Sequence, residues 1–153
     1  MHLSQTAQYA LRALLHIELR TPHFVPVGEL AGPVGAHANY LSKTLHQLVR
    51  AGILTSCRGP AGGFKLAVPA DSLTMSRVVA VFSAPASGLC LLDGGMCTGK
   101  VLCAVHRRWR EVAQPMDAFF NTTTIADLRA DARPSSETSQ PDTVNLSTRG
   151  LHQ

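Results

Sequence analysis

The chain has 153 residues, of which 45% are apolar and 5% aromatic, and its formal net charge is +4. This composition predicts one aliphatic-core domain with room for a tail, and the basic balance suits an anionic partner. No run of about 18 apolar residues and no secretory pattern is present, so we expect a cytoplasmic protein without a membrane span. In the cytoplasm four reduced cysteines are expected to bind metal or sense redox rather than form disulfides.

The N-terminal residues show the apolar periodicity of three helices. Ser4 is suited to cap the first helix, in which apolar residues recur at three- and four-residue spacing from Ala7 to Ile17. Residues 27–34 predict a short second helix and residues 38–51 a third, with a turn at 35–37 between them. Gly52 is placed to end the third helix in a left-handed conformation. The expected inward residues of the third helix are Leu41, Leu45, Leu48 and Val49.

A β-hairpin is predicted directly after these helices. A strand over residues 53–56, a Gly-rich turn over residues 58–63 and a returning strand over residues 64–67 make up a wing. Residues 72–82 predict a fourth helix with Ser72 as its cap. The expected fold class is mainly α with a small β-hairpin wing, and residues 1–82 form a winged helix-turn-helix DNA-binding domain.

The C-terminal half divides into a loop, a long helix and a tail. Residues 83–100 are Gly-rich and polar, residues 101–130 predict a dimerisation helix with a final turn at 124–130, and residues 131–153 have the composition of a disordered tail. Within residues 102–120, alternating three- and four-residue spacing is typical of a seam that packs on a partner helix. Pro115 predicts a kink or break near residue 114. The seam consists of Leu102, Val105, Trp109, Val112, Met116 and Phe119.

The third predicted helix and the wing carry residues suited to DNA. Residues 1–70 contain six Arg or Lys residues and only two Glu residues, which places phosphate binding in this half. Each segment alone could be a solvent-exposed helix or an ordinary hairpin without a role in DNA binding. The helix-turn-helix followed directly by the Gly-rich wing favours DNA binding. A nucleotide loop is disfavoured because the Lys and the following helix are absent. The candidates are Asn39, Ser42 and Lys43 for base edges, Tyr40, His46 and Arg50 for the DNA backbone, Arg58 for the minor groove, and Gly59, Gly62 and Gly63 for close approach to phosphate.

Three cysteines form the second constellation. Cys90, Cys97 and Cys103 have six and five residues between them, without the paired Cys-x-x-Cys spacing of zinc sites. Thiolates in a Gly-rich loop are soft ligands that can surround an iron–sulfur cluster. His106 lies three residues after Cys103 and is the candidate fourth ligand, or else a surface or dimer-face histidine. Cys57 is expected to be an ordinary strand residue, and a catalytic Cys103–His106 pair is disfavoured because no orienting acid or amide is evident nearby.

These stretches together resemble the Rrf-two family of winged-helix transcriptional regulators. The likeness covers about residues 1–130, and it includes the wing Arg58 to Leu66, the three cysteines and the run Thr124 to Leu128. The resemblance implies a homodimer on a palindromic promoter. It also implies a 2Fe-2S or 4Fe-4S cluster held by Cys90, Cys97 and Cys103, which senses nitric oxide, iron supply or cluster supply. Some members take a carboxylate ligand from the first helix of the other subunit, where this chain has Gln8, a poor ligand. This departure favours His106 or a small external ligand as the fourth ligand.

The leading hypothesis is a repressor whose DNA affinity changes when the cluster reacts or is lost. The first alternative is a regulator without a cluster that responds through its thiols or through a ligand. The second is a thiol-dependent enzyme, which lacks any recognisable acid–base set.

Overall fold

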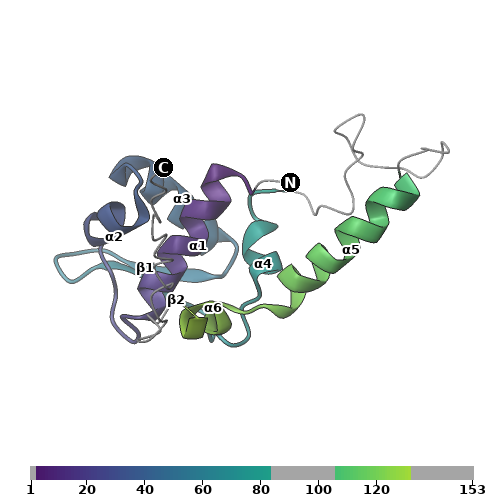
Figure 1. The fold of residues 1–153 in the computed structure, drawn as a ribbon. Coiled ribbons are helices and arrows are strands. Elements are labelled where there is room, and N and C mark those ends of the chain that lie inside the picture. Colours follow the sequence, from purple (N-terminus) through teal and green to yellow (C-terminus); the bar gives the residue numbers. More distant parts are fainter. Residues whose placement is uncertain (1–2, 84–105, 132–153) are drawn as a thin grey trace, which may run out of the picture.

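The computed structural model describes residues 3–83 and 106–131, and it has the expected fold class (Figure 1). Helices dominate, and the two strands form one antiparallel hairpin. Within the described ranges, no helix is long and apolar enough to cross a membrane. The elements are α1 (Gln5–Glu18), α2 (Val27–Val34), α3 (Ala38–Arg50), β1 (Leu54–Cys57), β2 (Gly63–Leu66), α4 (Met75–Val79), α5 (His106–Thr122) and α6 (Ile125–Asp131).

The first three helices begin and end close to the positions predicted from sequence. The Ser4 hydroxyl accepts a hydrogen bond from the Ala7 N–H at 3.2 Å and caps α1, as expected. At the end of α3, Gly52 has φ 69°, which glycine adopts without steric cost. The Ile53 N–H then donates to the Leu48 carbonyl at 2.9 Å, so the chain leaves the helix through a Schellman-type ending.

The wing is attached to the body by a third extended segment. The hairpin pairs Leu54 with Leu66 at its base and Cys57 with Gly63 near the tip. Phe64 forms an additional bridge with Val25, with hydrogen bonds of 2.9 Å in both directions. Each strand is displaced by one residue from the predicted range, and Ile53 is excluded from β1 because its N–H serves the end of α3.

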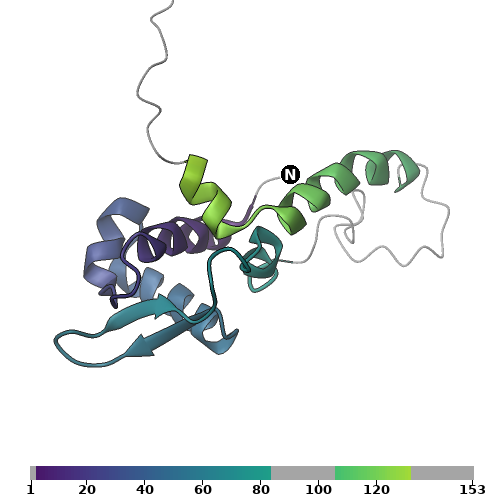
Figure 2. The same ribbon diagram turned by 90° about the horizontal axis from the view of Figure 1, so that it is seen from below.

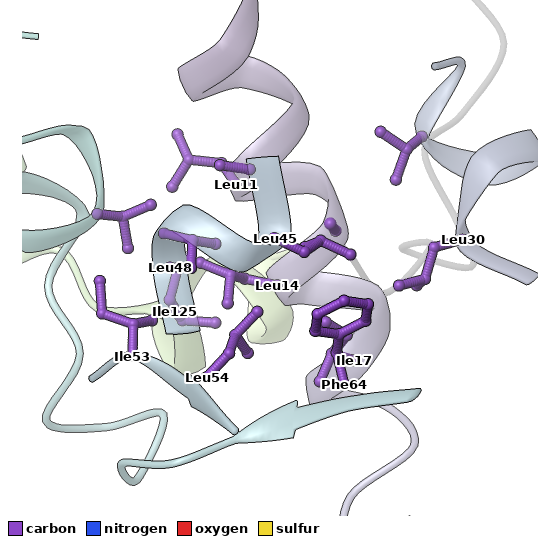
Figure 3. Close-up of a cluster of buried hydrophobic side chains, with 14 of the residues drawn as sticks. Leu11, Leu14, Ile17, Leu30, Leu45, Leu48, Ile53, Leu54, Phe64 and Ile125 are labelled. Atoms are coloured by element: carbon purple, nitrogen blue, oxygen red, sulfur yellow. The ribbon is translucent and has the colours of Figure 1, made fainter. Parts of the chain in front are cut away.

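A single aliphatic core joins the helices, the hairpin and α6 (Figure 3). Leu14 and Ile17 of α1 and Leu45 and Leu48 of α3 are fully buried, and Phe64 of the wing is 5% exposed. Full burial of one such side chain stabilises the fold by about 1.5–3 kcal/mol relative to an exposed position. This core therefore fixes α3 against α1 and orients its opposite face outward.

The prediction of a fourth helix over residues 72–82 with Ser72 as its cap is wrong in extent. The helix covers Met75–Val79, and its cap is Thr74, whose hydroxyl accepts from the Arg77 N–H at 3.4 Å. The preceding residues pair instead with the segment before α6: Met75 N–H donates to Thr123 O, and Ile125 N–H donates to Leu73 O, both at 2.9 Å. Backbone groups used in this way hold the preceding segment in an extended path, so the helix cannot begin at residue 72.

Helix α5 leaves the body of the molecule as a long arm (Figures 1 and 2). It continues through Pro115 to Thr122, so the predicted break near residue 114 does not occur. Both Pro115 and Glu111 are exposed, so the carbonyl that lacks its helical hydrogen bond lies on a face open to water. The predicted start at residue 102, with Leu102 and Val105 of the seam, lies outside the described residues.

Helix α6 anchors the C-terminal end of this arm to the body (Figure 1). The Arg129 guanidinium pairs with the Glu18 carboxylate of α1, and Ile125 is fully buried. Thr124 and Asp127 form a capping box: the Asp127 N–H donates to the Thr124 hydroxyl at 3.1 Å, and the Thr124 N–H donates to the Asp127 carboxylate at 2.9 Å. The hydrogen bond from the Thr124 hydroxyl is the main cause that lowers the pKa of Asp127, and the bond from the Thr124 N–H is the second. The final turn expected over residues 124–130 is thus a helix that extends to Asp131, and the rest of the predicted tail lies outside the described residues.

The capping box predicts a measurable loss of stability on substitution of Thr124. Thr124→Ala removes the hydroxyl that caps α6, and we expect the free energy of unfolding to fall by about 1 kcal/mol. Thr124→Ser is the control, because it retains the hydroxyl. Urea denaturation measures both variants. The pKa of Asp127 is lowered in the folded state. The stability that its ionised carboxylate contributes is therefore fully present above the ordinary carboxyl pKa, and it is lost as the pH falls through the lowered, folded-state pKa. Equal stability of the Ala and Ser variants would contradict the assigned cap.

Candidate DNA-binding surface

Helix α3 presents a polar face opposite its buried one. Leu41, Leu45 and Leu48 are fully buried against the core, as predicted, and Val49 is half-buried. The predicted DNA-contacting residues of this helix lie on the other side. Asn39, Tyr40, Lys43, His46 and Arg50 are exposed, and Ser42 is half-buried. The structure thus brings the predicted set together on one accessible helix face.

The start of α3 is capped by His37, which the sequence predicts only as part of a turn. The His37 ring Nδ1 accepts a hydrogen bond from the Asn39 N–H at 3.4 Å. Histidine is not among the favoured capping residues, so residue type gave no signal for this role. The cap matters for function because DNA-reading helices contact base edges with their first turns.

Tyr40 connects the first turn of α3 to α1. Its hydroxyl lies at 2.5 Å from the Thr6 hydroxyl, and its ring meets the Tyr9 ring edge-on with centroids 6.0 Å apart. The Thr44 hydroxyl donates to the Tyr40 carbonyl at 3.1 Å, which satisfies a buried polar group. Thr6, Tyr9 and Thr44 were not singled out from sequence, because no periodicity marks side chains that position a neighbour.

The fold itself requires glycine in the wing, in addition to the close approach to phosphate that is predicted there. Gly59 has φ 111° and open space around it. A Cβ at Gly62 would lie 2.4 Å from the Cys57 carbonyl oxygen, and one at Gly63 would lie 2.3 Å from the Val25 carbonyl oxygen. The last two positions therefore need glycine because backbone segments of the protein itself approach closely. The adjacent Arg58 is exposed near the tip.

The electrostatics of this surface are one-sided. From Leu30 to Ala70 the chain contains no Asp or Glu, whereas Lys43, Arg50, Arg58 and Lys65 all fall within this stretch. Lys65 holds its ammonium 4.9 Å from the Phe24 ring centroid, a cation–π contact that does not neutralise its charge. Positive side chains without acidic partners give a surface that attracts phosphate.

The candidate cluster ligands fall mostly in the other part of the chain. Cys90, Cys97 and Cys103 lie outside the described residues, and His106 is the first residue of α5. Residues 3–83 and 106–131 contain no group of three His, Cys, Asp or Glu side chains that could hold a metal ion. Cys57 is a free, exposed thiol at the end of β1, in keeping with its expected place in a wing strand.

A family model described as "Iron-dependent Transcriptional regulator", Rrf2, matches residues 3–131. The chain belongs to the Rrf2 family. An HTH-type transcriptional regulator of Aquifex aeolicus is 35% identical to this Rrf2 protein over 131 residues, which cover 84% of this chain and 91% of the relative. IscR of Vibrio parahaemolyticus, also an HTH-type transcriptional regulator, is 28% identical over 152 residues, which cover 99% of this chain and 90% of that protein.

Solved structures share the fold of this Rrf2 protein. CymR, described as the global cysteine regulator of B. subtilis, matches with a TM-score of 0.74 and 20% identity over 86% of this chain and 98% of that one. IscR of T. potens matches with a TM-score of 0.72 and 19% identity over 92% and 94% of the two chains. The Rrf2 protein is thus a winged-helix, DNA-binding transcriptional regulator, and the alternative of a thiol-dependent enzyme is set aside.

The exposed position of Arg58 predicts its effect on DNA binding by this Rrf2 protein. Arg58→Ala should weaken binding across sequences and reduce the slope of log affinity against log salt by about one per protomer, because one phosphate-neutralising charge is lost. Arg77→Ala removes an exposed charge from α4 and is the matched control. Fluorescence anisotropy over a salt series measures both. An unchanged salt slope in Arg58→Ala would exclude a wing contact with phosphate.

Proposed function

We propose that the chain is an iron–sulfur cluster-dependent transcriptional repressor that responds to nitric oxide, redox stress, or iron and cluster supply. The observation that carries the proposal is the match to a family described as iron-dependent regulators in a chain with three closely spaced cysteines. The operator-contacting residues are Asn39, Tyr40, Ser42, Lys43, His46, Arg50, Arg58, Gly59, Gly62 and Gly63.

The donor chemistry of the chain fits an iron–sulfur cluster. Cys90, Cys97 and Cys103 would supply three thiolates, the ligand type that such clusters prefer. His106 is the proposed fourth ligand, because histidine replaces cysteine at some cluster irons. When bound, the group supplies iron that reacts with nitric oxide and oxidants.

Gln8 is a weaker candidate for the fourth ligand than His106. The Gln8 side-chain N–H donates to the Leu3 carbonyl of the same chain at 3.0 Å, which ties this amide to the beginning of α1. An amide oxygen carries no charge and binds iron less well than imidazole or carboxylate. This intrachain bond therefore supports the assignment of His106.

The proposed assembly is a homodimer formed through α5. Rrf2 regulators typically act as dimers, and α5 carries an uncovered apolar seam in which Val112 is 63% and Phe119 53% exposed. A second α5 with the same seam would cover these side chains. Two-fold symmetry would then place two α3 helices on a palindromic operator.

Residues of the chain provide a route from the cluster ligands to α3. His106 begins α5, α5 continues to the α6 junction, and Arg129 of α6 pairs with Glu18 of α1. The buried residues of α1 pack on those of α3. A change in the position of α5 would thus alter the separation of the two α3 helices. About 3 kcal/mol of coupling free energy, roughly 100-fold in affinity, is enough to relieve repression.

The second candidate function is a regulator without a cluster that responds through its thiols or through a ligand. It is favoured by the shared fold with CymR, which is described as a global cysteine regulator. The fold alone is therefore compatible with either signal, and iron content separates the two candidates.

Substitution of one proposed ligand tests the cluster. Cys97→Ser should lose most of the iron, acid-labile sulfide and visible absorption that wild-type protein retains when it is purified without oxygen. Cys57→Ser is the matched control, because Cys57 lies in the wing and should not affect iron content. Colourless, iron-free wild-type protein would overturn the proposal in favour of the cluster-free candidate.

A charge in the α5 seam tests the dimer. Val112→Glu places a carboxylate in the proposed interface, and we expect the dimer to dissociate to monomers, as measured by analytical ultracentrifugation. Gln114→Glu adds a negative charge at another exposed position of the same helix and should stay dimeric. Circular dichroism checks that both variants keep their helical content. A dimer of unchanged affinity in Val112→Glu would rule out this seam.

A further inference from the structure

His46 is held in one tautomer by its own helix. Its ring Nδ1 lies 2.8 Å from the Ser42 carbonyl oxygen. A carbonyl oxygen only accepts hydrogen bonds, so Nδ1 must carry a hydrogen. Any further proton can therefore bind only at Nε2, which is a lone-pair acceptor in the neutral ring and an N–H donor in the imidazolium.

The same ring lies at the junction between α3 and the wing. It meets the Phe64 ring at right angles with centroids 5.2 Å apart. Phe64 is itself fixed, since its backbone makes both bridge hydrogen bonds with Val25. His46 is thus an exposed side chain with little freedom, placed between the two elements that contact DNA in winged-helix proteins.

The acidic groups of the helices that pack on α3 and the hairpin already have partners: Glu18 of α1 pairs with Arg129, and Glu29 of α2 pairs with Arg20. On α3 the neighbouring charges are Lys43 and Arg50, and the Arg50 guanidinium donates to the His46 carbonyl at 3.5 Å. In the hairpin the titratable and charged groups are the Cys57 thiol, Arg58 at the tip and Lys65. The stretch from residue 30 to residue 70, which contains all of α3 and the hairpin, has no carboxylate. A counter-ion for the imidazolium must therefore come from a bound partner.

We propose that DNA binding is coupled to the uptake of one proton per protomer at His46 Nε2, which then donates to a backbone phosphate between α3 and the wing. The proton comes from solvent, and the phosphate supplies the negative charge that the free protein lacks at this position. Affinity for DNA should accordingly rise as the pH falls through the histidine range. This inference rests on the DNA-binding part of the proposed function and not on the cluster.

His37 is the informative contrast on the same helix. Its Nδ1 accepts the Asn39 N–H, and a protonated ring could not accept it. Acid would therefore remove the cap of α3, the opposite effect from that proposed at His46. His37→Asn keeps a favoured cap that does not titrate and so isolates the contribution of His46.

The experiment measures the dissociation constant of full-length protein for a fluorescein-labelled, mixed-sequence duplex at low salt by anisotropy. A phosphate contact does not depend on base sequence, so this probe suffices. We expect the wild-type constant to fall by about tenfold between about pH 8 and about pH 6. His46→Gln should keep the weaker value at both pH values, and His46→Lys, with a fixed charge, the tighter one. His37→Asn, which lacks the opposing loss of the cap in acid, should show a pH dependence at least as steep as that of wild type.

The outcomes separate the inference from the function on which it rests. The proton uptake at His46 is overturned if His46→Gln keeps the wild-type pH dependence of DNA binding. It is also overturned if neither wild type nor His37→Asn shows a pH dependence. Visible absorption in the same buffers shows whether any pH dependence follows a cluster instead, and a parallel change would also overturn it. Failure of wild type to bind the duplex at any pH would contradict the DNA-binding role itself.

Discussion

The packing of α3 against α1 is the constraint on which the other features depend. Leu41, Leu45 and Leu48 face a core to which α1, the hairpin and α6 all contribute. Because these residues fix the rotation of α3, they also determine which side chains face outward. The same contacts make the position of α3 sensitive to α1, and through Glu18 and Arg129 to the end of the α5 arm. Rigid packing of this kind transmits displacement instead of absorbing it.

Much of the fold follows from local sequence rules. The helix-turn-helix could be predicted because its apolar period, the Ser4 cap and the Gly52 ending all act over a few residues. The hairpin was predicted to within one residue for the same reason. For the candidate site, sequence identified the exposed face of α3 and the tip of the wing. Their contact with DNA, like the ligand role of the cysteines, stays a prediction.

The parts that sequence did not give depend on contacts between distant segments. Residues before α4 look helical in isolation, but their backbone groups pair with the segment that leads into α6. Pro115 was expected to interrupt α5, yet the exposure of its neighbourhood lets the helix continue. The roles of His37 as a cap and of Tyr40 as a link to Thr6 depend on side-chain geometry that residue type does not encode.

The carboxylate-free stretch between Glu29 and Asp71 has a kinetic consequence as well. A surface of one sign accelerates diffusional encounter with a polyanion, and it holds the protein loosely on non-operator DNA while it translocates. The target search of this regulator should thus be fast at low ionic strength and slow steeply as salt is added. Glu18 and Glu29, which precede that stretch, are each paired with an arginine, and this pairing limits how much they subtract from the positive field.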